Sequence, residues 1–72
     1  MDILDIQLKE KIKTIPHKPG CYLWKDKKGI VIYVGKAVDL NNRVKQYFLK
    51  DRDLKTRKLV NEINDIDYVL VT

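Results

Sequence analysis

Apolar residues recur along the first part of the chain at the spacing of an amphipathic helix. This helix would span residues 3–15, and Pro16 would end it, because proline lacks the N–H group that a helix interior requires. The pair Pro19-Gly20 marks a second break before the next element. The apolar face of the helix would consist of Leu4, Leu8, Ile12 and Ile15.

Two runs rich in β-branched and aromatic residues then predict a β-hairpin. The strands would cover residues 20–25 (GCYLWK) and 30–34 (IVIYV), with Asp26 opening and Gly29 closing the turn between them. With this turn, the last residue of the first strand would pair with the first residue of the second.

In that register Tyr22 would lie directly opposite Tyr33, with the two phenols about 5 Å apart on one face of the sheet. A loop of three or five residues would change this pairing. Leu23 and Ile32 would pair on the other face, which we assign to the hydrophobic core. A cross-strand aromatic pair also stabilises many sheets, so the two tyrosines alone do not define a functional site.

The second half of the chain predicts two helices and a third strand. Asp39 is a candidate N-cap for a helix over residues 40–49, and a further helix would run from about residue 53 to residue 63. Residues 67–72 (DYVLVT) would form the last strand. The apolar faces of the two helices would consist of Leu40, Val44 and Phe48 and of Leu59, Val60 and Ile63.

This order, α-β-β-α-α-β, lacks the strand–helix alternation of a parallel doubly wound sheet. It predicts an α+β fold in which helices flank a small, mainly antiparallel three-stranded sheet. With 72 residues, the chain is long enough for one small domain over residues 1–72. The content of 44% hydrophobic and 35% charged residues is typical of a soluble globular protein rather than a disordered chain.

Composition also narrows the setting in which the protein works. No apolar run approaches the roughly 20 residues that cross a bilayer, and the N-terminus is acidic where a signal peptide is basic. We therefore expect a cytoplasmic protein with no membrane partner. Cys21 is the only cysteine, which excludes an internal disulfide and a cysteine-based zinc site.

Residues 41–58 carry seven basic and two acidic groups, which account for the whole net charge of +5. Such a local basic field suits nucleic acid, because contacts with phosphates supply the sequence-independent part of its binding. A solvated helical surface explains the same charges equally well. The candidate DNA-binding residues in this stretch are Lys45, Arg52, Lys55, Arg57 and Lys58.

A second group of residues suggests phosphodiester chemistry. Gly35 and Lys36 follow Tyr33, and Arg43 and Tyr47 are four residues apart, so they share one face of their helix. A phenol beside a cation can help to take a proton from water, and a guanidinium can stabilise charge that develops on a phosphate. The residues that could converge are Tyr22, Tyr33, Lys36, Arg43 and Tyr47.

Three other residues have a functional and a structural interpretation, and the structural one is favoured for each. His17 is expected to be an exposed loop residue rather than a general base. Cys21 is expected to be buried and inert, on the face opposite Tyr22. Trp24 shares the Tyr22 face and could stack on a base, but covering the sheet is the preferred role.

The tripeptides Gly20-Cys21-Tyr22 and Tyr33-Val34-Gly35, followed by Arg43 and Tyr47, resemble the motifs of the GIY-YIG nuclease family, with cysteine in the usual isoleucine position. Three longer strings are similar to its UvrC branch in particular. They are KPGCYLWKDKKGIVIYVGKA (18–37), LNNRVKQYF (40–48) and KTRKLVNEI (55–63), and together they cover nearly the whole chain.

The resemblance implies a role for each matching residue. Tyr22 and Tyr33 would lie at the attacking water, Lys36 would tune a tyrosine, Arg43 would hold the cleaved phosphate, and Tyr47 would add a hydroxyl near that phosphate. Gly20 and Gly35 would let the backbone approach the site closely.

The resemblance also implies one divalent metal, Mg²⁺ or Mn²⁺, held by a glutamate on a helix after the third strand. No residue here matches that glutamate, because Glu10 and Glu62 lie in other elements. We therefore expect the 72-residue chain to be a truncated domain without efficient catalysis of its own.

By the same resemblance, the function would be incision of damaged double-stranded DNA on the 3′ side of a lesion during nucleotide excision repair, with UvrB as partner. One alternative is a DNA-binding module without catalysis. Another is a homing, restriction or stand-alone repair nuclease of the same family.

Overall fold

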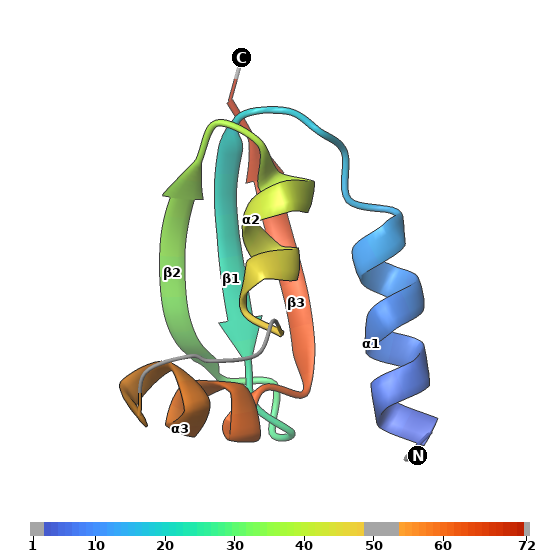
Figure 1. Cartoon of the computed structure of the whole chain (residues 1–72), viewed down its shortest axis with the longest axis vertical. Helices are drawn as coiled ribbons and strands as arrows, with labels where there is room; N and C mark the ends of the chain where they lie inside the picture. The colour runs from blue at the N-terminus through green and yellow to red at the C-terminus, as the bar shows by residue number, and fades with distance from the viewer. Residues whose placement is uncertain (1–2, 49–53, 72) are drawn as a thin grey trace.

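The computed structural model describes residues 3–48 and 54–71, and its elements follow the predicted order (Figure 1). The six elements are α1 (Ile3–Lys13), β1 (Gly20–Lys25), β2 (Val31–Ala37), α2 (Leu40–Gln46), α3 (Leu54–Glu62) and β3 (Asp65–Leu70). All the predicted helices and strands are therefore present. Within the described residues, no helix is long and apolar enough to cross a membrane.

The boundaries of several elements differ from the prediction by a few residues. α1 ends at Lys13 because Thr14 turns back, with its N–H and hydroxyl both donating to the Lys11 carbonyl, at 3.0 and 2.6 Å. β2 extends three residues beyond the predicted end, to Ala37, because β1 pairs with it over its whole length. β3 starts and ends two residues earlier than predicted.

β1 is the central strand of an antiparallel sheet with the order β2-β1-β3. α2 crosses one face of this sheet, α1 runs alongside β3, and α3 lies across the end of the sheet near the hairpin turn (Figure 1). The sheet and its helices confirm the predicted α+β class.

The hairpin turn forms at the predicted residues but has a longer loop. The Gly29 N–H donates to the Asp26 carbonyl at 3.0 Å, and the Asp26 N–H donates to the Ile30 carbonyl at 3.0 Å. Gly29 has φ of +80°, the left-handed conformation that glycine adopts at no steric cost. This is the pattern of a three-residue hairpin loop.

The predicted direct pair of Tyr22 and Tyr33 is wrong. Tyr22 lies opposite Gly35 and Trp24 lies opposite Tyr33, with a β-bulge where the pairing shifts between Trp24 and Lys25. The turn and the bulge each add one residue to the β2 side. A shift of one residue moves a side chain to the other face, and a second shift restores it. Tyr22 and Tyr33 therefore still share one face, as diagonal neighbours.

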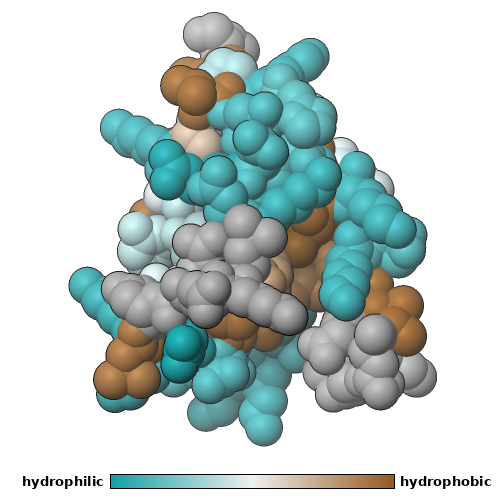
Figure 2. Space-filling model, in the orientation of Figure 1, coloured by the Kyte–Doolittle hydropathy of each residue, from teal (hydrophilic) through white to brown (hydrophobic). Residues whose placement is uncertain are grey.

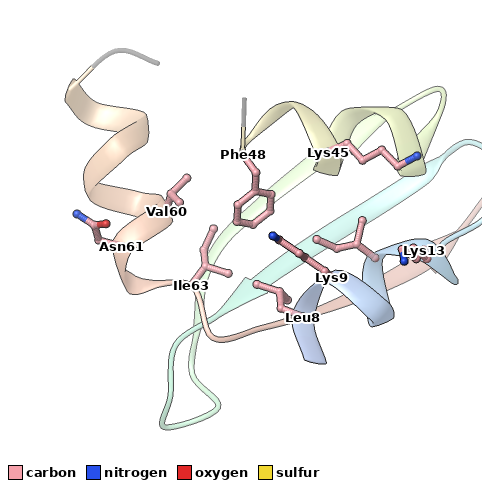
Figure 3. Close-up of a pocket in the computed structure, with 9 residues that line it drawn as sticks. Leu8, Lys9, Lys13, Lys45, Phe48, Val60, Asn61 and Ile63 are labelled. Atoms are coloured by element: carbon pink, nitrogen blue, oxygen red, sulfur yellow. The ribbon is translucent and has the colours of Figure 1, made fainter. Parts of the chain in front are cut away.

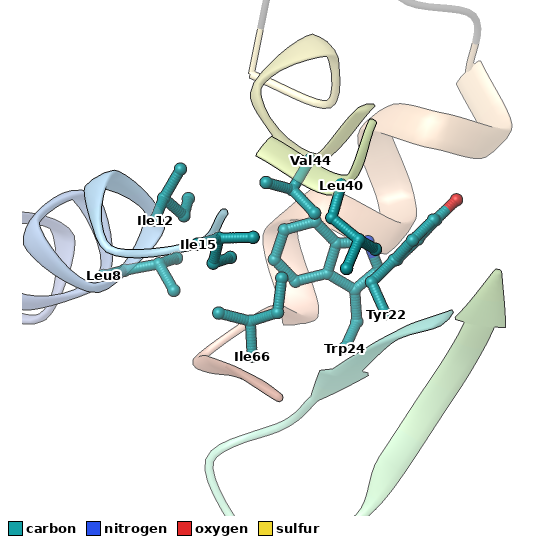
Figure 4. Packing of buried hydrophobic residues seen from close by; sticks show 8 residues of the cluster. All are labelled: Leu8, Ile12, Ile15, Tyr22, Trp24, Leu40, Val44 and Ile66. Atoms are coloured by element: carbon teal, nitrogen blue, oxygen red, sulfur yellow. The ribbon is translucent and has the colours of Figure 1, made fainter. Parts of the chain in front are cut away.

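The assignment of the core to the Leu23 face is also wrong. Leu23 pairs with Val34, and Leu23 is half-buried while Val34 is exposed. The core lies on the opposite face, beneath α1 and α2, where Trp24 is fully buried (Figure 4). Its buried apolar residues are Leu8, Ile12, Ile15, Tyr22, Trp24, Leu40, Val44 and Ile66.

The predicted apolar faces of the later helices are only partly buried. Leu59 and Ile63 of the α3 region pack against the core, while Phe48 remains 42% exposed. Phe48 and Val60 help to line a hollow of about 610 Å³ between α1, the end of α2 and α3 (Figure 3). Figure 2 shows hydrophobic surface there, between the hydrophilic side chains of α1 and those of α2.

The outer face of the sheet carries an ion-pair network. Lys25 on β1 pairs with Asp67 on β3, and Lys11 of α1 reaches Asp65 at 2.7 Å and Asp67 at 3.8 Å. The hydrogen bond from Lys25 is the largest cause that lowers the pKa of Asp67, and its charge and that of Lys11 add to the effect. The network thus links α1 and β1 to the edge strand β3.

We expect Asp67→Asn to lower the free energy of unfolding slightly near pH 6 and to have no effect in strong acid. The folded-state pKa of Asp67 is depressed, so its contribution is present above the unfolded pKa and is lost as the pH falls through the folded pKa. The pair is open to solvent, which keeps the effect small. Urea unfolding at pH 6 and pH 2 measures it.

Glu62→Gln is the control, because the Glu62 carboxylate makes no ion pair with any described residue. A stability loss for Asp67→Asn that persists at pH 2 would contradict the electrostatic explanation.

Candidate active site

Three tyrosines from three elements contact one another on the core face of the sheet. The hydroxyls of Tyr22 on β1 and Tyr47 at the end of α2 are hydrogen-bonded at 2.8 Å. The Tyr33 ring of β2 lies 6.3 Å from the Tyr22 ring and 6.5 Å from the Tyr47 ring, centroid to centroid. The structure therefore brings these three predicted site residues together.

The three phenols differ in their access to solvent. Tyr22 is 3% exposed, Tyr47 is half-buried and Tyr33 is 45% exposed. The Tyr22 hydroxyl is occupied by the hydrogen bond with Tyr47, whereas Tyr33 makes no such bond with a described residue. Tyr33 is thus the phenol of the cluster that a water or a phosphate can reach most easily.

Gly35 is the residue that lets Tyr22 lie against β2. A Cβ atom built at Gly35 would overlap the ring and hydroxyl of Tyr22, which is the side chain facing it across the strand pair. Only glycine leaves room for this close approach. The glycine predicted to be a motif residue therefore has a packing reason to be present.

Trp24 supports the cluster from within the core. Its ring contacts Tyr47 at 5.2 Å, Tyr22 at 6.2 Å and Phe48 at 5.7 Å in edge-to-face geometry. Since Trp24 is fully buried, it covers the sheet, as preferred from the sequence, and cannot stack on a base.

The environment of Tyr47 keeps its phenol protonated. Burial is the largest cause that raises the pKa of Tyr47, and the hydrogen bond with Tyr22 raises it further. The nearby indole N–H of Trp24 opposes this rise to a smaller extent. Tyr47 is consequently a neutral hydroxyl near pH 7, able to donate a hydrogen bond but poorly suited to accept a proton.

Lys36 does not face the tyrosines as the sequence suggested. Lys36 lies opposite Cys21, so its side chain leaves β2 on the face away from Tyr22 and Tyr33. Arg43 is exposed on α2, and the two cations line a common hollow of about 420 Å³ at the end of the sheet. Half-buried Cys21, expected to be fully buried, also lines this hollow.

The predicted DNA-binding cations are exposed. Lys45 lies on α2, while Lys55, Arg57 and Lys58 lie on α3. None of these four makes an ion pair with a described residue, so their charge is available to a polyanion. Arg52 lies outside the described residues.

Two features of the site were not found from the sequence. Tyr68 lies directly opposite Tyr22 on β3, so it emerges from the same sheet face, 38% exposed. His17 is exposed, as expected, but its Nδ1 lies 2.9 Å from the Asp39 carboxylate. Asp39 also accepts the Asn42 N–H as the N-cap of α2, which confirms that cap. Tyr68 could not be placed beside Tyr22 from the sequence, because that position depends on the strand order β2-β1-β3.

The sequence matches one family model, described as the UvrC-like GIY-YIG domain, over residues 18–72. The chain belongs to the UvrC-like GIY-YIG family. Two curated relatives are named UvrABC system protein C. The protein from Malacoplasma penetrans (strain HF-2) is 82% identical over 65 residues, which are 90% of this chain. The protein from Ureaplasma parvum serovar 3 is 61% identical over 64 residues, or 89% of the chain. The chain spans 11% of the length of either relative.

A solved structure supports the same GIY-YIG fold. The GIY-YIG N-terminal endonuclease domain of UvrC from Thermotoga maritima, bound to its catalytic magnesium, superimposes with a TM-score of 0.78 at 32% identity. The match covers 100% of this chain and 75% of that domain.

The described part of this GIY-YIG chain holds no cluster of metal ligands. Within residues 3–48 and 54–71, no three histidine, cysteine, aspartate or glutamate side chains come together. Glu10 pairs with Lys13 on α1, and Glu62 lies near the hairpin turn. Neither carboxylate is among the residues that contact the tyrosines.

We expect Tyr22→Phe to lower the pKa of Tyr47 while leaving it above the ordinary value of a phenol. The substitution keeps the ring against Gly35 but removes the hydroxyl that is hydrogen-bonded to Tyr47, whereas burial, the larger cause, remains. Titration of the tyrosine Cζ signals by ¹³C NMR measures the change.

Tyr68→Phe is the matched control, because Tyr68 has no part in the Tyr47 hydrogen bond. An unchanged Tyr47 titration in Tyr22→Phe would mean that the two hydroxyls do not meet in solution.

Proposed function

We propose that this chain is the nuclease module of an excision-repair protein and hydrolyses a phosphodiester bond on the 3′ side of a DNA lesion. The observation that carries the proposal is the cluster of Tyr22, Tyr33 and Tyr47, in a chain of the UvrC-like GIY-YIG family. Simple phosphate binding does not require a hydrogen-bonded pair of phenols, one of them buried, beside a third exposed one.

Tyr33 is proposed as the phenol that acts on the attacking water. It is the exposed member of the cluster, and its hydroxyl forms no hydrogen bond with a described residue that would occupy it. In its phenolate form, Tyr33 within hydrogen-bond reach of the water would take the proton of that water and become a neutral phenol as the water oxygen attacks phosphorus. The first-motif tyrosine, Tyr22, then holds the cluster together rather than meeting the water directly.

Tyr47 is proposed to donate its hydrogen bond to a phosphate oxygen or to Tyr22. Its raised pKa keeps the proton on the hydroxyl, so it acts as a donor throughout the neutral range. Because Tyr47 sits at the end of α2 and Arg43 one turn earlier, both project from the same side of that helix.

Arg43 and Lys36 are proposed to hold the phosphate of the cleaved strand. Arginine offers forked donors to phosphate oxygens, and it retains its charge as charge develops in the transition state. Their shared hollow at the end of the sheet supports a phosphate-binding role, and Lys36 supplies charge there rather than contacting a tyrosine.

The exposed cations Lys45, Lys55, Arg57 and Lys58 are proposed to bind the DNA backbone on either side of this site. Damaged duplex DNA is the proposed substrate and UvrB the proposed recruiting partner. The resemblance implies a divalent metal, which when bound would stabilise charge on the phosphate. The described residues provide no site for it, so we assign no metal ligand in this chain.

We expect Arg43→Ala in the full-length repair protein to reduce 3′ incision by about 100-fold or more, since a donor to the developing charge is lost. The 5′ cut, attributed to a separate nuclease domain, should remain. Gel assays that resolve the two cuts on lesion-containing DNA, with UvrB supplied, measure both rates.

Lys9→Ala is the control, because it removes the same charge from exposed α1 and leaves α2 unchanged. An equal loss of both cuts in Arg43→Ala would point to a folding or recruitment defect and would count against the proposed role.

We expect the 72-residue chain alone not to nick lesion-containing duplex in Mg²⁺ or Mn²⁺, and a version extended through the next helix to do so with UvrB. The reason is that no residue of this sequence matches the glutamate that would hold the metal, since Glu10 and Glu62 lie in other elements. Efficient nicking by the shorter chain would refute this. DNA binding by both versions without nicking would favour the non-catalytic DNA-binding module.

A further inference from the structure

α2 is too short to hold its own position. It has seven residues, Leu40–Gln46, yet it carries Arg43 and leads directly into Tyr47. Helices this short have little stability in isolation, because few hydrogen bonds offset the cost of forming the first turn. The placement of both side chains therefore depends on what α2 is attached to.

The N-terminal end of α2 is fastened to the segment between α1 and β1. The Leu40 N–H donates to the Lys18 carbonyl at 3.1 Å, and the Asn41 N–H donates to the Pro16 carbonyl at 3.3 Å. These N–H groups have no partner inside the helix, so the segment supplies the acceptors that the helix end lacks.

The side chain of Asn41 extends this attachment to α1 itself. Its Nδ2 donates to the Ile15 carbonyl at 2.8 Å, just beyond the C-terminal end of α1, and to the Ile12 carbonyl at 3.2 Å, which also accepts the Ile15 N–H at 3.1 Å. Asn41 is 3% exposed and is the buried polar residue of the described core. Its two hydrogen bonds are therefore shielded from water, and losing them would leave the Ile15 carbonyl without this donor.

Asn41 and Arg43 point to opposite sides of α2. Two residues correspond to about 200° around a helix, so Asn41 faces α1 while Arg43 faces away. Asn41 thus attaches the side of α2 that faces α1, and its side chain does not contact the phenols or Arg43. The apolar contacts of Leu40 and Val44 press α2 against the sheet but do not fix its rotation or its position along its axis as directional hydrogen bonds do (Figure 4).

We infer that Asn41 is a positioning residue, which sets the placement of α2 and thereby of Arg43 and Tyr47 relative to Tyr22 and Tyr33. The inference rests on the proposed nuclease function for its catalytic consequence. Small displacements of groups that act on a reacting phosphate are costly, so loss of this attachment should slow incision without weakening DNA binding.

The test compares Asn41→Ala with Asn42→Ala in the full-length protein, with UvrB and lesion-containing DNA. Asn42 is the matched neighbour, because its side chain is exposed and only its backbone N–H bonds Asp39. Leu8→Ala serves as a stability control, because it weakens the core from α1 without removing an α2 hydrogen bond. All rates are measured well below the melting temperature of each variant.

Asn41→Ala should slow single-turnover 3′ incision by about 10- to 100-fold at unchanged Kd for DNA and an unchanged 5′ cut. Asn41→Gln should restore part of the rate, because its amide keeps N–H donors for the two carbonyls without placing a charge at this buried position.

Incision by Asn41→Ala at the rate of Asn42→Ala would overturn the inference. So would an equal slowing in Leu8→Ala at matched stability, because the effect would then be general loss of the core.

A spectroscopic measurement separates this inference from the proposed function. Trp24 is the only tryptophan and its ring lies 5.2 Å from Tyr47, so its fluorescence reports the placement of the end of α2. Asn41→Ala should shift the Trp24 emission in folded protein, while Asn42→Ala should not. Absence of 3′ incision in the unmodified protein would refute the function, whereas an unshifted emission in Asn41→Ala would refute the positioning role.

Discussion

Trp24 lies at the centre of the contact between the sheet and α2, and the remaining core residues pack around it. It is fully buried in the middle strand, with Tyr22 on its own strand and Tyr47 and Phe48 above it. Removing such a ring from a core typically costs about 3–5 kcal/mol, a large share of the stability of a small domain. The core and the phenol cluster thus depend on the same side chain.

This shared packing explains why a small domain can hold three phenols in fixed positions. Tyr22 is at once a core residue and a hydrogen-bond partner of Tyr47, and Gly35 provides the space that its ring needs. Rigid placement by packing on strands is what preorganised catalytic groups require. Tyr33 can then be exposed, because it rests on side chains that are already held.

The charged groups are arranged differently from the phenols. The outer face of the sheet neutralises itself through Lys25, Asp67, Asp65 and Lys11. The cations of α2 and α3 have no such partners among the described residues, so their charge is available to attract a polyanion.

The sequence alone determined the order and type of the elements, because helical and strand periodicities, Pro16, the Asp26–Gly29 turn and the Asp39 cap are local signals. It also identified the three tyrosines that meet, since two of them share a strand face and the third follows the next helix. The predicted register is wrong, yet Tyr22 and Tyr33 do share one face of the sheet as predicted. The reason is that the turn and the bulge each shift the pairing by one residue.

Only the tertiary structure decided which face of the sheet is the core, where Lys36 points, and how α2 is anchored. The two sheet faces both carry apolar residues, so the pattern could not choose between Leu23 and Trp24. The bulge depends on how β2 twists against β1, and the bonds from Asn41 to the Ile12 and Ile15 carbonyls join segments distant in the chain. Such contacts follow from packing rather than from local propensity, and for that reason no sequence pattern contains them.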